Sequence, residues 1–136
     1  MDCIFCKISK NEIPSQTIYE DEHFKAIMDI APASKGHVIL IPKEHCTNLY
    51  DLDDEIASQS LVVSKKIAIA LRDELACDGL NVIQNNNEIA GQTVFHFHIH
   101  LIPRYKDDKV RIGWNTVKYL DGENVKIAER LSGKLM

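Results

Sequence analysis

The 136-residue chain lacks any run of about 20 apolar residues, the length that a membrane-spanning helix requires. It has no internal repeat, low-complexity segment or Gly/Ser-rich linker, and only six glycines and four prolines interrupt it. No basic stretch followed by an apolar run stands at the N-terminus, so no secretory signal is expected. No basic stripe with interleaved aromatic residues is present, which argues against a nucleic-acid polymer as partner. We therefore expect one cytoplasmic domain with free thiols, without a membrane association.

The charge of the chain is unevenly distributed. Residues 1–103 carry 8 Lys and Arg against 15 Asp and Glu, a net charge of −7, whereas residues 104–136 carry 8 against 5, a net charge of +3. Two interpretations of the basic C-terminal segment stay open. It is either a solvated tail, or a tail that docks on an acidic surface or near an anionic ligand.

The hydrophobic pattern predicts both strands and helices. Apolar runs bounded by charged turns or prolines predict strands at residues 17–20, 24–29, 37–42, 79–84 and 94–102. Helical periodicity predicts a long helix over 53–77, which Asp51 or Asp53 can cap, and the last two strands should pair as an antiparallel hairpin. A last helix is expected over 123–134, capped by Asp121. These elements lack a βαβ alternation, which predicts an α+β fold with an antiparallel sheet of about five strands, covered on one face.

Three of the six histidines occupy alternate positions in the last predicted strand. Alternate side chains of a strand share a face, so the three histidines should lie opposite a set of apolar residues. The histidines are His96, His98 and His100, and the apolar set is Phe95, Phe97, Ile99 and Leu101. The apolar face should pack on the core, because a one-residue slip would bury three imidazoles. We therefore expect the histidines to face an open surface or cleft.

Three interpretations of this histidine row compete: tolerated surface residues, a metal site and a catalytic row. Strict alternation with aromatic and apolar residues disfavours the first. On a regular strand the backbones of the outer histidines lie about 13 Å apart, whereas a Zn–N bond is only about 2 Å, so one ion cannot readily bind all three. A catalytic row fits better, since neutral imidazole can attack phosphorus and a second imidazole on the same face can hold the phosphate oxygens.

The segment Gly91–Ile102 resembles the signature of the histidine triad (HIT) family, His-φ-His-φ-His-φ-φ with φ apolar, preceded by a Gly-Gln pair. Further matches follow in chain order at Cys3–Ile8, Glu12–Pro14, Tyr19–Asp21, Asp29–Ile30, Gly36–Val38 and Ile41–His45. The resemblance implies a HIT domain over residues 3–105. It leaves residues 106–136 as a basic tail with a helix, part of the same domain or of a dimer interface, and it implies a homodimer.

The resemblance also implies roles for individual residues. It makes His98 the nucleophile that forms a nucleotidyl-histidine, with His100 at the phosphate or ribose. Gln92 and Thr93 fall at the scissile phosphate and leaving group, while His37 either hydrogen-bonds within the site or is a buried structural residue. The residues matched to nucleotide binding are Asp29, which accepts the ribose hydroxyls, and Phe5, Ile8, Ile27, Ile30 and Asn85. For Ile27 and Ile30 a core position is an equal alternative.

Cys3 and Cys6 form a Cys-x-x-Cys pair near the N-terminus. Some bacterial-type members of the family bind a structural zinc through such a pair, the histidine after an Ile-Pro-Lys segment and the first triad histidine. The matching residues here are Cys3, Cys6, His45 and His96. Redox or free thiols are the alternative, although the usual redox motif follows a strand and opens a helix.

The substrate class that the resemblance implies is a purine nucleoside phosphoramidate, such as AMP linked to an amine. The segment Leu101–Tyr105 departs from the ending common in the phosphoramidase branch. Dinucleoside polyphosphate hydrolysis therefore stays an alternative, in which Arg104 meets additional phosphates. A non-catalytic nucleotide-binding interaction protein is the alternative outside the enzymes.

Overall fold

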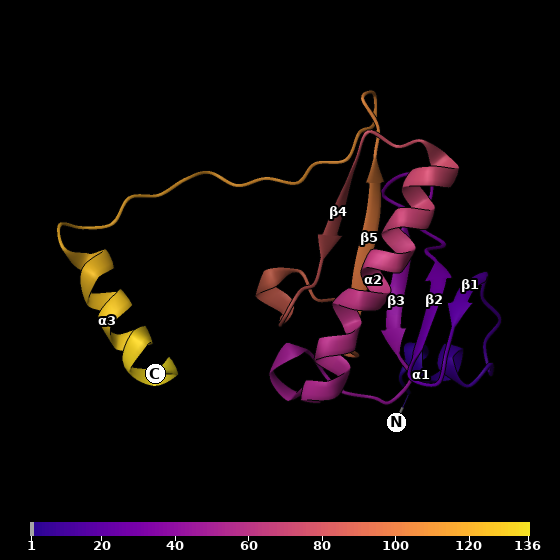
Figure 1. The fold of residues 1–136 in the computed structure, drawn as a ribbon, viewed down its shortest axis with the longest axis horizontal. Helices are drawn as coiled ribbons and strands as arrows, with labels where there is room; N and C mark the ends of the chain where they lie inside the picture. Colours follow the sequence, from indigo (N-terminus) through magenta and orange to yellow (C-terminus); the bar gives the residue numbers. More distant parts are fainter. Residues whose placement is uncertain (1) are drawn as a thin grey trace.

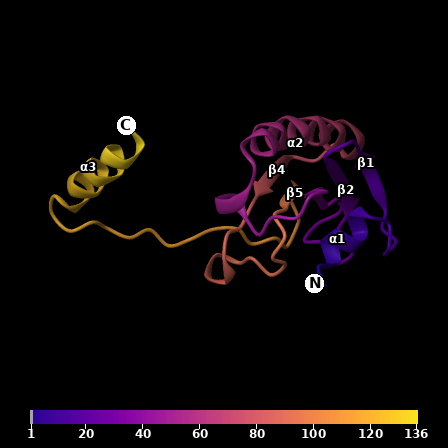
Figure 2. The ribbon, with the colours of Figure 1, turned by 90° about the horizontal axis from the view of Figure 1, so that it is seen from below.

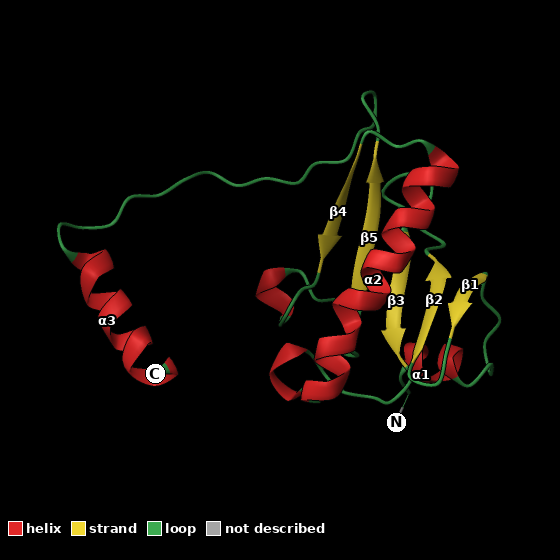
Figure 3. Cartoon of the chain, viewed as in Figure 1, coloured by secondary structure: helices red, strands yellow, loops and turns green. Residues whose placement is uncertain are grey.

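The computed structural model describes residues 2–136, and its body is an antiparallel sheet with helices on its faces (Figure 1, Figure 3). The strands are β1 (Thr17–Glu20), β2 (Phe24–Met28), β3 (Val38–Pro42), β4 (Gly79–Ile83) and β5 (Ile99–Arg104). Their order is β1-β2-β3-β5-β4, and each neighbouring pair is antiparallel. The helices are α1 (Ile4–Ser9), α2 (Asp54–Leu75) and α3 (Glu123–Leu135), with 3-10 turns at Leu49–Asp51 and Glu88–Ala90. The predicted five-stranded α+β fold is confirmed.

The long helix α2 covers one face of the sheet. Its N-cap is Asp53, whose carboxylate accepts hydrogen bonds from the backbone N–H groups of Glu55 and Ile56. Spacing of three or four residues places one apolar stripe of α2 toward the sheet. That stripe and the facing strand residues form the main core: Val63, Ile67 and Leu71 with Phe24, Ala26, Val38, Leu40, Phe97, Ile99 and Leu101.

The short helix α1 lies on the opposite face of the sheet from α2, as Figure 2 shows. Its residues Phe5 and Ile8 form a second core with Ile27, Ile39 and Ile41. Lys25, which is 1% exposed, points to the same side and donates through Nζ to the carbonyl oxygen of Ile8, at 3.0 Å. The expectation that the sheet is covered on one face was therefore incomplete, because α1 shields part of the other.

The histidine segment is only half a strand, since β5 begins at Ile99 and residues 94–98 are bent or irregular. Phe97, Ile99 and Leu101 do pack in the α2-side core, as the alternation predicts, but Phe95 is 48% exposed. His96 is fully buried and His98 is 7% exposed. Of the two expected positions, an open surface or a cleft, the open surface is therefore excluded for these two histidines, because Phe5 of α1 packs against both rings, with ring centroids 6.0 and 4.9 Å away.

The C-terminal part of the chain leaves the body as an extended arm, residues 111–122, that carries α3 away past the β4 side of the sheet (Figure 1). The predicted helix is present, but Asp121 does not cap it. Gly122 is the N-cap, with φ 76°, and Glu123 accepts through Oε1 from the N–H of Leu120 at 3.0 Å. Among residues 2–136, no helix is long and apolar enough to cross a bilayer.

Candidate functional site

Three histidines gather on the sheet face that carries α1. Register between β3 and β5 pairs Ile39 with His100, which brings the start of β3 beside the histidine segment. His37 precedes β3 and lies against His100, with ring centroids 5.1 Å apart. His98 lies between His100 and Phe5, with its ring centroid 4.9 Å from each. The structure thus brings His37, His98 and His100 into one cluster and places Phe5 at its edge.

The ring of His98 is oriented by a backbone carbonyl. His98 Nδ1 lies 2.6 Å from the carbonyl oxygen of His96, so Nδ1 carries the proton and donates to it. Burial lowers the pKa of His98, which keeps the ring neutral near pH 7. In the neutral ring the unprotonated nitrogen is then Nε2. A neutral imidazole with one fixed proton and one available lone pair is suited to attack an electrophilic centre.

A chain of hydrogen bonds also sets the protons of His37 and His100. The backbone N–H of Ala33 donates to His37 Nδ1 at 2.9 Å, which leaves the proton of neutral His37 on Nε2. That Nε2–H donates to His100 Nδ1, also at 2.9 Å, so neutral His100 carries its own proton on Nε2. Burial, followed by repulsion from His98 and His37 when those rings become protonated in acid, lowers the pKa of His100 to about 4. His100 is therefore a neutral donor beside the lone pair of His98.

Asp29 lies at the rim of this cluster. Its Oδ1 accepts from the N–H of Ala31 at 2.8 Å, and its Oδ2 is 3.5 Å from His37 Nε2. Asp29, His37 and His100 are close enough together to hold a metal ion. However, a neutral His37 ligating through Nε2 would need a proton on Nδ1, where the Ala33 N–H already donates. The hydrogen bonds therefore favour neutral histidines with fixed protons over a bound metal ion at this place. The carboxylate of Asp29 lies beside them.

A second cluster contains the four residues matched to a zinc site. Cys3 Sγ is 3.4 Å from His96 Nδ1, and Cys6 Sγ is 3.5 Å from the same nitrogen. His45 Nδ1 is 3.3 Å from Cys6 Sγ and 3.1 Å from His96 Nδ1. All four donor atoms lie within 4.8 Å of one another. They come from the two ends of the first turn of α1, the segment after β3 and the bend before β5.

The donor set fits a tetrahedral Zn²⁺. Bonds of about 2.0 and 2.3 Å to nitrogen and sulfur place neighbouring tetrahedral ligand atoms roughly 3.3–3.8 Å apart, close to the distances observed. His96 Nε2 donates to the carbonyl oxygen of Pro42 at 2.8 Å, which leaves Nδ1 as the lone pair facing the thiols. Cys46 stays outside the cluster: burial raises its pKa to about 11, so it remains a thiol, and it packs against the main core.

Gln92 is 1% exposed, and its side-chain amide is occupied by the protein itself. Nε2 donates to the carbonyl oxygens of Thr47, at 2.7 Å, and Val94, at 3.1 Å. Oε1 accepts from the N–H of Asn87 at 2.8 Å. Gln92 therefore joins three loop segments around the histidines, a positioning that the sequence did not indicate.

The remaining predicted site residues are spread around the cluster. Thr93 is exposed and lines a pocket of about 430 Å³ with Cys3 and His45, on the zinc-ligand side of the row. Asn85 donates to the carbonyl oxygen of Gly91 at 3.5 Å. Phe5, Ile8 and Ile27 are buried in the α1-side core, whereas Ile30 is 97% exposed, so a core position for Ile30 is excluded in this chain.

Two supporting residues were missed by sequence reasoning. Asn48, 6% exposed, caps a 3-10 turn reciprocally with Asp51 and donates to the side-chain oxygens of Asn87 and Gln92, at 3.2 and 3.5 Å. Its spacing from Asp51 is that of a capping box, a signal that could have indicated it. No sequence pattern could have indicated that the Ala33 N–H orients His37, because every residue except proline carries a backbone N–H.

The chain resembles known proteins over most of its length. The family model described as HIT domain matches residues 10–107. "Protein hit" of Bacillus subtilis is 48% identical over 96% of this chain and 95% of its own. An adenosine 5'-monophosphoramidase of Schizosaccharomyces pombe, hnt1, is 39% identical over 99% of each chain.

Solved structures extend the likeness to the arm and α3. A crystal structure of a HIT family protein from Bacillus subtilis, 44% identical, covers 100% of this chain and 99% of its own, with a TM-score of 0.93. A zinc-bound histidine triad family protein from Mycobacterium smegmatis, 36% identical, covers 100% and 99% with a TM-score of 0.78. The histidine cluster, the fold and these likenesses agree, and the chain belongs to the HIT family.

Proposed function

We propose that this chain is a nucleotide hydrolase that cleaves purine nucleoside phosphoramidates at the α-phosphorus, with His98 as nucleophile. The observation that carries the proposal is the hydrogen bond from His98 Nδ1 to the carbonyl oxygen of His96, because it leaves the Nε2 lone pair free in a neutral ring. The name of the Schizosaccharomyces pombe relative supports AMP bonded to an amine as the substrate class.

In the first step of this mechanism, His98 Nε2 attacks phosphorus and the P–N bond breaks. The electron pair leaves with the amine nitrogen, which takes up a proton from solvent. Nε2–H of His100 donates to a phosphate oxygen and stabilises the charge that develops there. His98 Nδ1–H stays bonded to the carbonyl oxygen of His96, which stabilises the positively charged nucleotidyl-imidazole.

In the second step, water attacks the same phosphorus and the P–Nε2 bond breaks. The electron pair returns to Nε2, and the proton of the water is released to solvent. We propose that Asp29 accepts the ribose hydroxyls at the rim of the site and that Phe5, Ile8, Ile27, Ile30 and Asn85 contact the rest of the nucleotide. Since the amide of Gln92 is occupied, we propose that it acts by holding Thr93 and the neighbouring loops in place.

The occupied guanidinium of Arg104 favours phosphoramidates over dinucleoside polyphosphates. Four of its N–H donors are used: two to Asp108, at 2.8 and 3.0 Å, one to Asn81 at 2.9 Å and one to the carbonyl oxygen of Val110 at 3.1 Å. The suggestion that Arg104 meets additional phosphates is therefore not supported. Hydrolysis of a dinucleoside polyphosphate stays the second candidate, tested in parallel.

The decisive experiment compares His98→Asn with His23→Asn, a control in the turn between β1 and β2, using AMP linked to an amine. Amine release should fall by several orders of magnitude in His98→Asn and stay unchanged in His23→Asn. Rapid acid-free denaturation of the wild type during turnover should yield an AMP adduct on the peptide that contains His98. Wild-type turnover in His98→Asn would leave a binding protein as the better assignment.

We further propose that Zn²⁺ is bound by Cys3, Cys6, His45 and His96. The ion would supply structural cross-linking there, tying α1 to the bend before β5, while His98 and His100 carry out the chemistry. The zinc-bound Mycobacterium smegmatis relative and the donor distances support this assignment. Without a cation, burial and the neighbouring Cys3 raise the pKa of Cys6, whereas a bound divalent ion would favour the thiolate.

We also propose that the protein acts in the cytoplasm as a homodimer, with residues 3–105 as the catalytic unit and residues 106–136 as the segment that joins two copies. The exposed apolar residues of the tail support this assignment: Trp114 is 86% exposed, Val117 92% and Leu120 76%. Apolar surface of this kind is usually covered by a partner.

A further inference from the structure

The loop before β3 lies beside the end of β5, beyond the last backbone pair of the two strands. Their pairing begins with Val38 opposite Leu101. Because the strands are antiparallel, the residues just before Val38 are next to those just after Leu101. Pro103 has no N–H and cannot donate to a further backbone pair. Two side-chain hydroxyl groups connect the two segments instead.

The two hydroxyl groups belong to Ser34 and Tyr105, one on each segment. Ser34 Oγ donates to the carbonyl oxygen of Pro103 at 2.5 Å, and Tyr105 Oη donates to the carbonyl oxygen of Lys35 at 2.7 Å. Both acceptors are backbone groups. The two bonds therefore fix the path of the chain on both sides of the contact.

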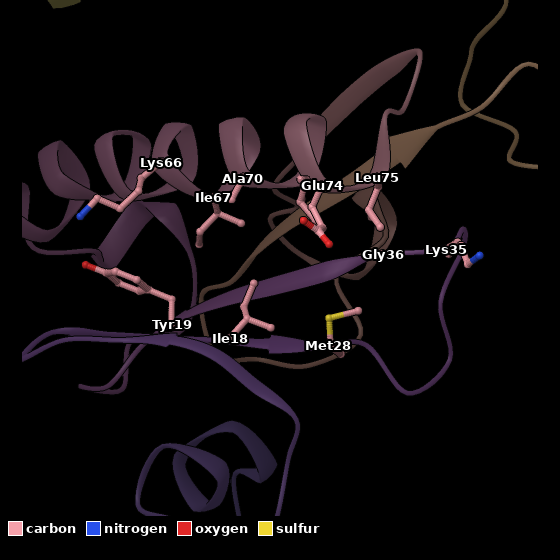
Figure 4. A pocket seen from close by; sticks show the side chains of 11 residues that line it. Ile18, Tyr19, Met28, Lys35, Gly36, Lys66, Ile67, Ala70, Glu74 and Leu75 are labelled. Carbon is pink, nitrogen blue, oxygen red and sulfur yellow. The ribbon is translucent and has the colours of Figure 1, made fainter.

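Gly36, the next residue of the loop, is closely packed. Lys35 and Gly36 lie beside Leu75 at the end of α2, where they line one end of an apolar pocket of about 410 Å³ (Figure 4). Gly36 has φ 93°, and a Cβ there would collide with the side chain of Leu75 and lie 3.2 Å from Pro103 Cγ. Residues 34–36 are therefore held against the end of β5, with the end of α2 beside them.

Tyr105 is itself held in place by a turn. Its N–H donates to Asp108 Oδ2 at 2.8 Å, and the Asp108 N–H donates to the carbonyl oxygen of Tyr105 at 3.1 Å. The same carboxylate accepts from Arg104 Nε and Nη2, at 2.8 and 3.0 Å. Arg104 thus holds Asp108, and Asp108 holds Tyr105, so the segment after β5 presents the Tyr105 hydroxyl to the loop in a fixed position.

The loop that these bonds hold contains the groups that set the protons of the histidine cluster. Ala33 donates its N–H to His37 Nδ1, and the His37 N–H donates to the carbonyl oxygen of Ser34 at 3.2 Å. His37 Nε2–H then donates to His100 Nδ1. His100 precedes Pro103 on β5. The restraints therefore form a closed ring, from His100 along β5 to the loop and back through His37.

We propose that Tyr105 and Ser34 are positioning residues for the histidine cluster, whose hydroxyl groups fix the loop so that His37 keeps the proton of neutral His100 on Nε2. The effect on turnover rests on the proposed function, whereas the effect on the histidine protons does not. When the loop is released, the Ala33 N–H no longer orients His37. His100 can then place its proton on Nδ1 and present a lone pair to the phosphate.

Full-length variants that each remove one hydroxyl group test this inference. They are Tyr105→Phe and Ser34→Ala, and the matched control is Tyr50→Phe, at a side chain that is 82% exposed. Each substitution is made in the wild type and in His37→Ala, and kcat and KM are measured on an AMP–amine conjugate. Circular dichroism and urea unfolding record the folding of every variant.

We expect Tyr105→Phe to lower kcat by about 2- to 10-fold with little change in KM, which is the rate change that corresponds to the net contribution of one hydrogen bond. In His37→Ala the same substitution should leave kcat unchanged, because the residue through which Tyr105 acts is missing. Tyr50→Phe should have no effect in either background. A role in stability alone would not make the effect of Tyr105→Phe depend on His37.

Nitrogen chemical shifts of the histidine rings at neutral pH report the protons without any substrate. In the wild type, His100 should show a protonated Nε2 and an unprotonated Nδ1. The double variant Tyr105→Phe/Ser34→Ala should show a mixture of both tautomers at His100. His98 should keep its proton on Nδ1, because the carbonyl oxygen of His96 accepts it. This measurement decides the inference even if the wild type does not hydrolyse the conjugate, so the two proposals can fail separately.

Two results would overturn the inference. One is a wild-type tautomer of His100 in the double variant, which would show that the loop needs neither hydroxyl group to orient His37. The other is an equal loss of kcat from Tyr105→Phe in the presence and in the absence of His37. If Tyr105→Phe does not fold, Ser34→Ala, which leaves the Tyr105 bond intact, is compared in the same two backgrounds.

Discussion

His37 Nε2 lies 2.9 Å from His100 Nδ1, and this contact determines which nitrogen of His100 presents a proton. His37 is itself oriented by the Ala33 N–H, so the proton order begins at the backbone. The cluster therefore contains a lone pair on His98 and an N–H on His100 side by side, each assigned by a hydrogen bond outside the reacting centre. The predictions on catalysis follow from this pairing of a lone pair on His98 with an N–H donor on His100.

Replacing His37 with alanine should lower kcat with little change in KM. Without His37, the proton of His100 can move to Nδ1, and the ring then presents a lone pair to the phosphate. The loss should be smaller than that in His100→Ala, for which removal of a direct donor typically costs about 10²–10³-fold. Steady-state kinetics of both variants on an AMP–amine conjugate test this order. Wild-type kcat in His37→Ala would show that His100 needs no such orientation.

Stability should decrease as the pH falls from about 6.5 to about 4. The folded pKa of His100 is lowered to about 4 by burial and by the charges of His98 and His37, and that of His37 is also lowered, chiefly by burial. Unfolded histidine titrates near 6.5, so within this window the unfolded chain binds more protons and is favoured by acid. Above about pH 6.5, His37 and His100 are neutral in the folded and in the unfolded chain. They should therefore not make the free energy of unfolding depend on pH in that range.

Urea unfolding at several pH values measures this dependence. His100→Asn, which cannot titrate, should show a shallower decrease than the wild type. Equal slopes in His100→Asn and the wild type would contradict a depressed pKa for His100.

Cys6→Ser should lose bound zinc and unfold at a lower temperature, because a ligand that binds only the folded state stabilises it by mass action. Metal analysis of protein expressed with supplied zinc should find about one ion per wild-type chain, as a single four-ligand site requires. Cys77→Ser, outside the cluster, should keep the ion. A wild-type protein without metal after zinc supply would refute the proposed site.

Gln92→Ala should lower the free energy of unfolding by about 1–3 kcal/mol and should also slow turnover, because it removes a buried amide that makes three hydrogen bonds to the backbone of the surrounding loops. The exposed neighbour Thr93 provides the contrast: Thr93→Ala should change the free energy of unfolding by less than about 0.5 kcal/mol. Denaturant titrations compare the two. Reduced turnover at unchanged stability in Gln92→Ala would instead favour direct contact with the substrate.

Local pattern was sufficient for most of the fold. Spacing of apolar residues predicted α2, the strands β1–β4 and α3, but it started the last strand at residue 94, whereas β5 begins at Ile99. The capping carboxylate of Asp53 was among the expected ones. Two helix features near the chain ends were not predicted correctly. The helix α1 has only 6 residues, too few for a periodic signal, and α3 begins after Gly122 instead of being capped by Asp121.

The sequence by itself determined which chemistry-bearing residues the chain has and their order: three alternating histidines, the Cys-x-x-Cys pair and the Gly-Gln pair before them. The tertiary structure alone decided which of their atoms meet. Strand alternation would place His96, His98 and His100 on one open face, but the bend before β5 turns His96 to Cys3, Cys6 and His45, and α1 buries His98. The protons of His98 and His100 depend on a backbone carbonyl and on the Ala33 N–H. Backbone groups are identical in every residue, so only packing could place them there.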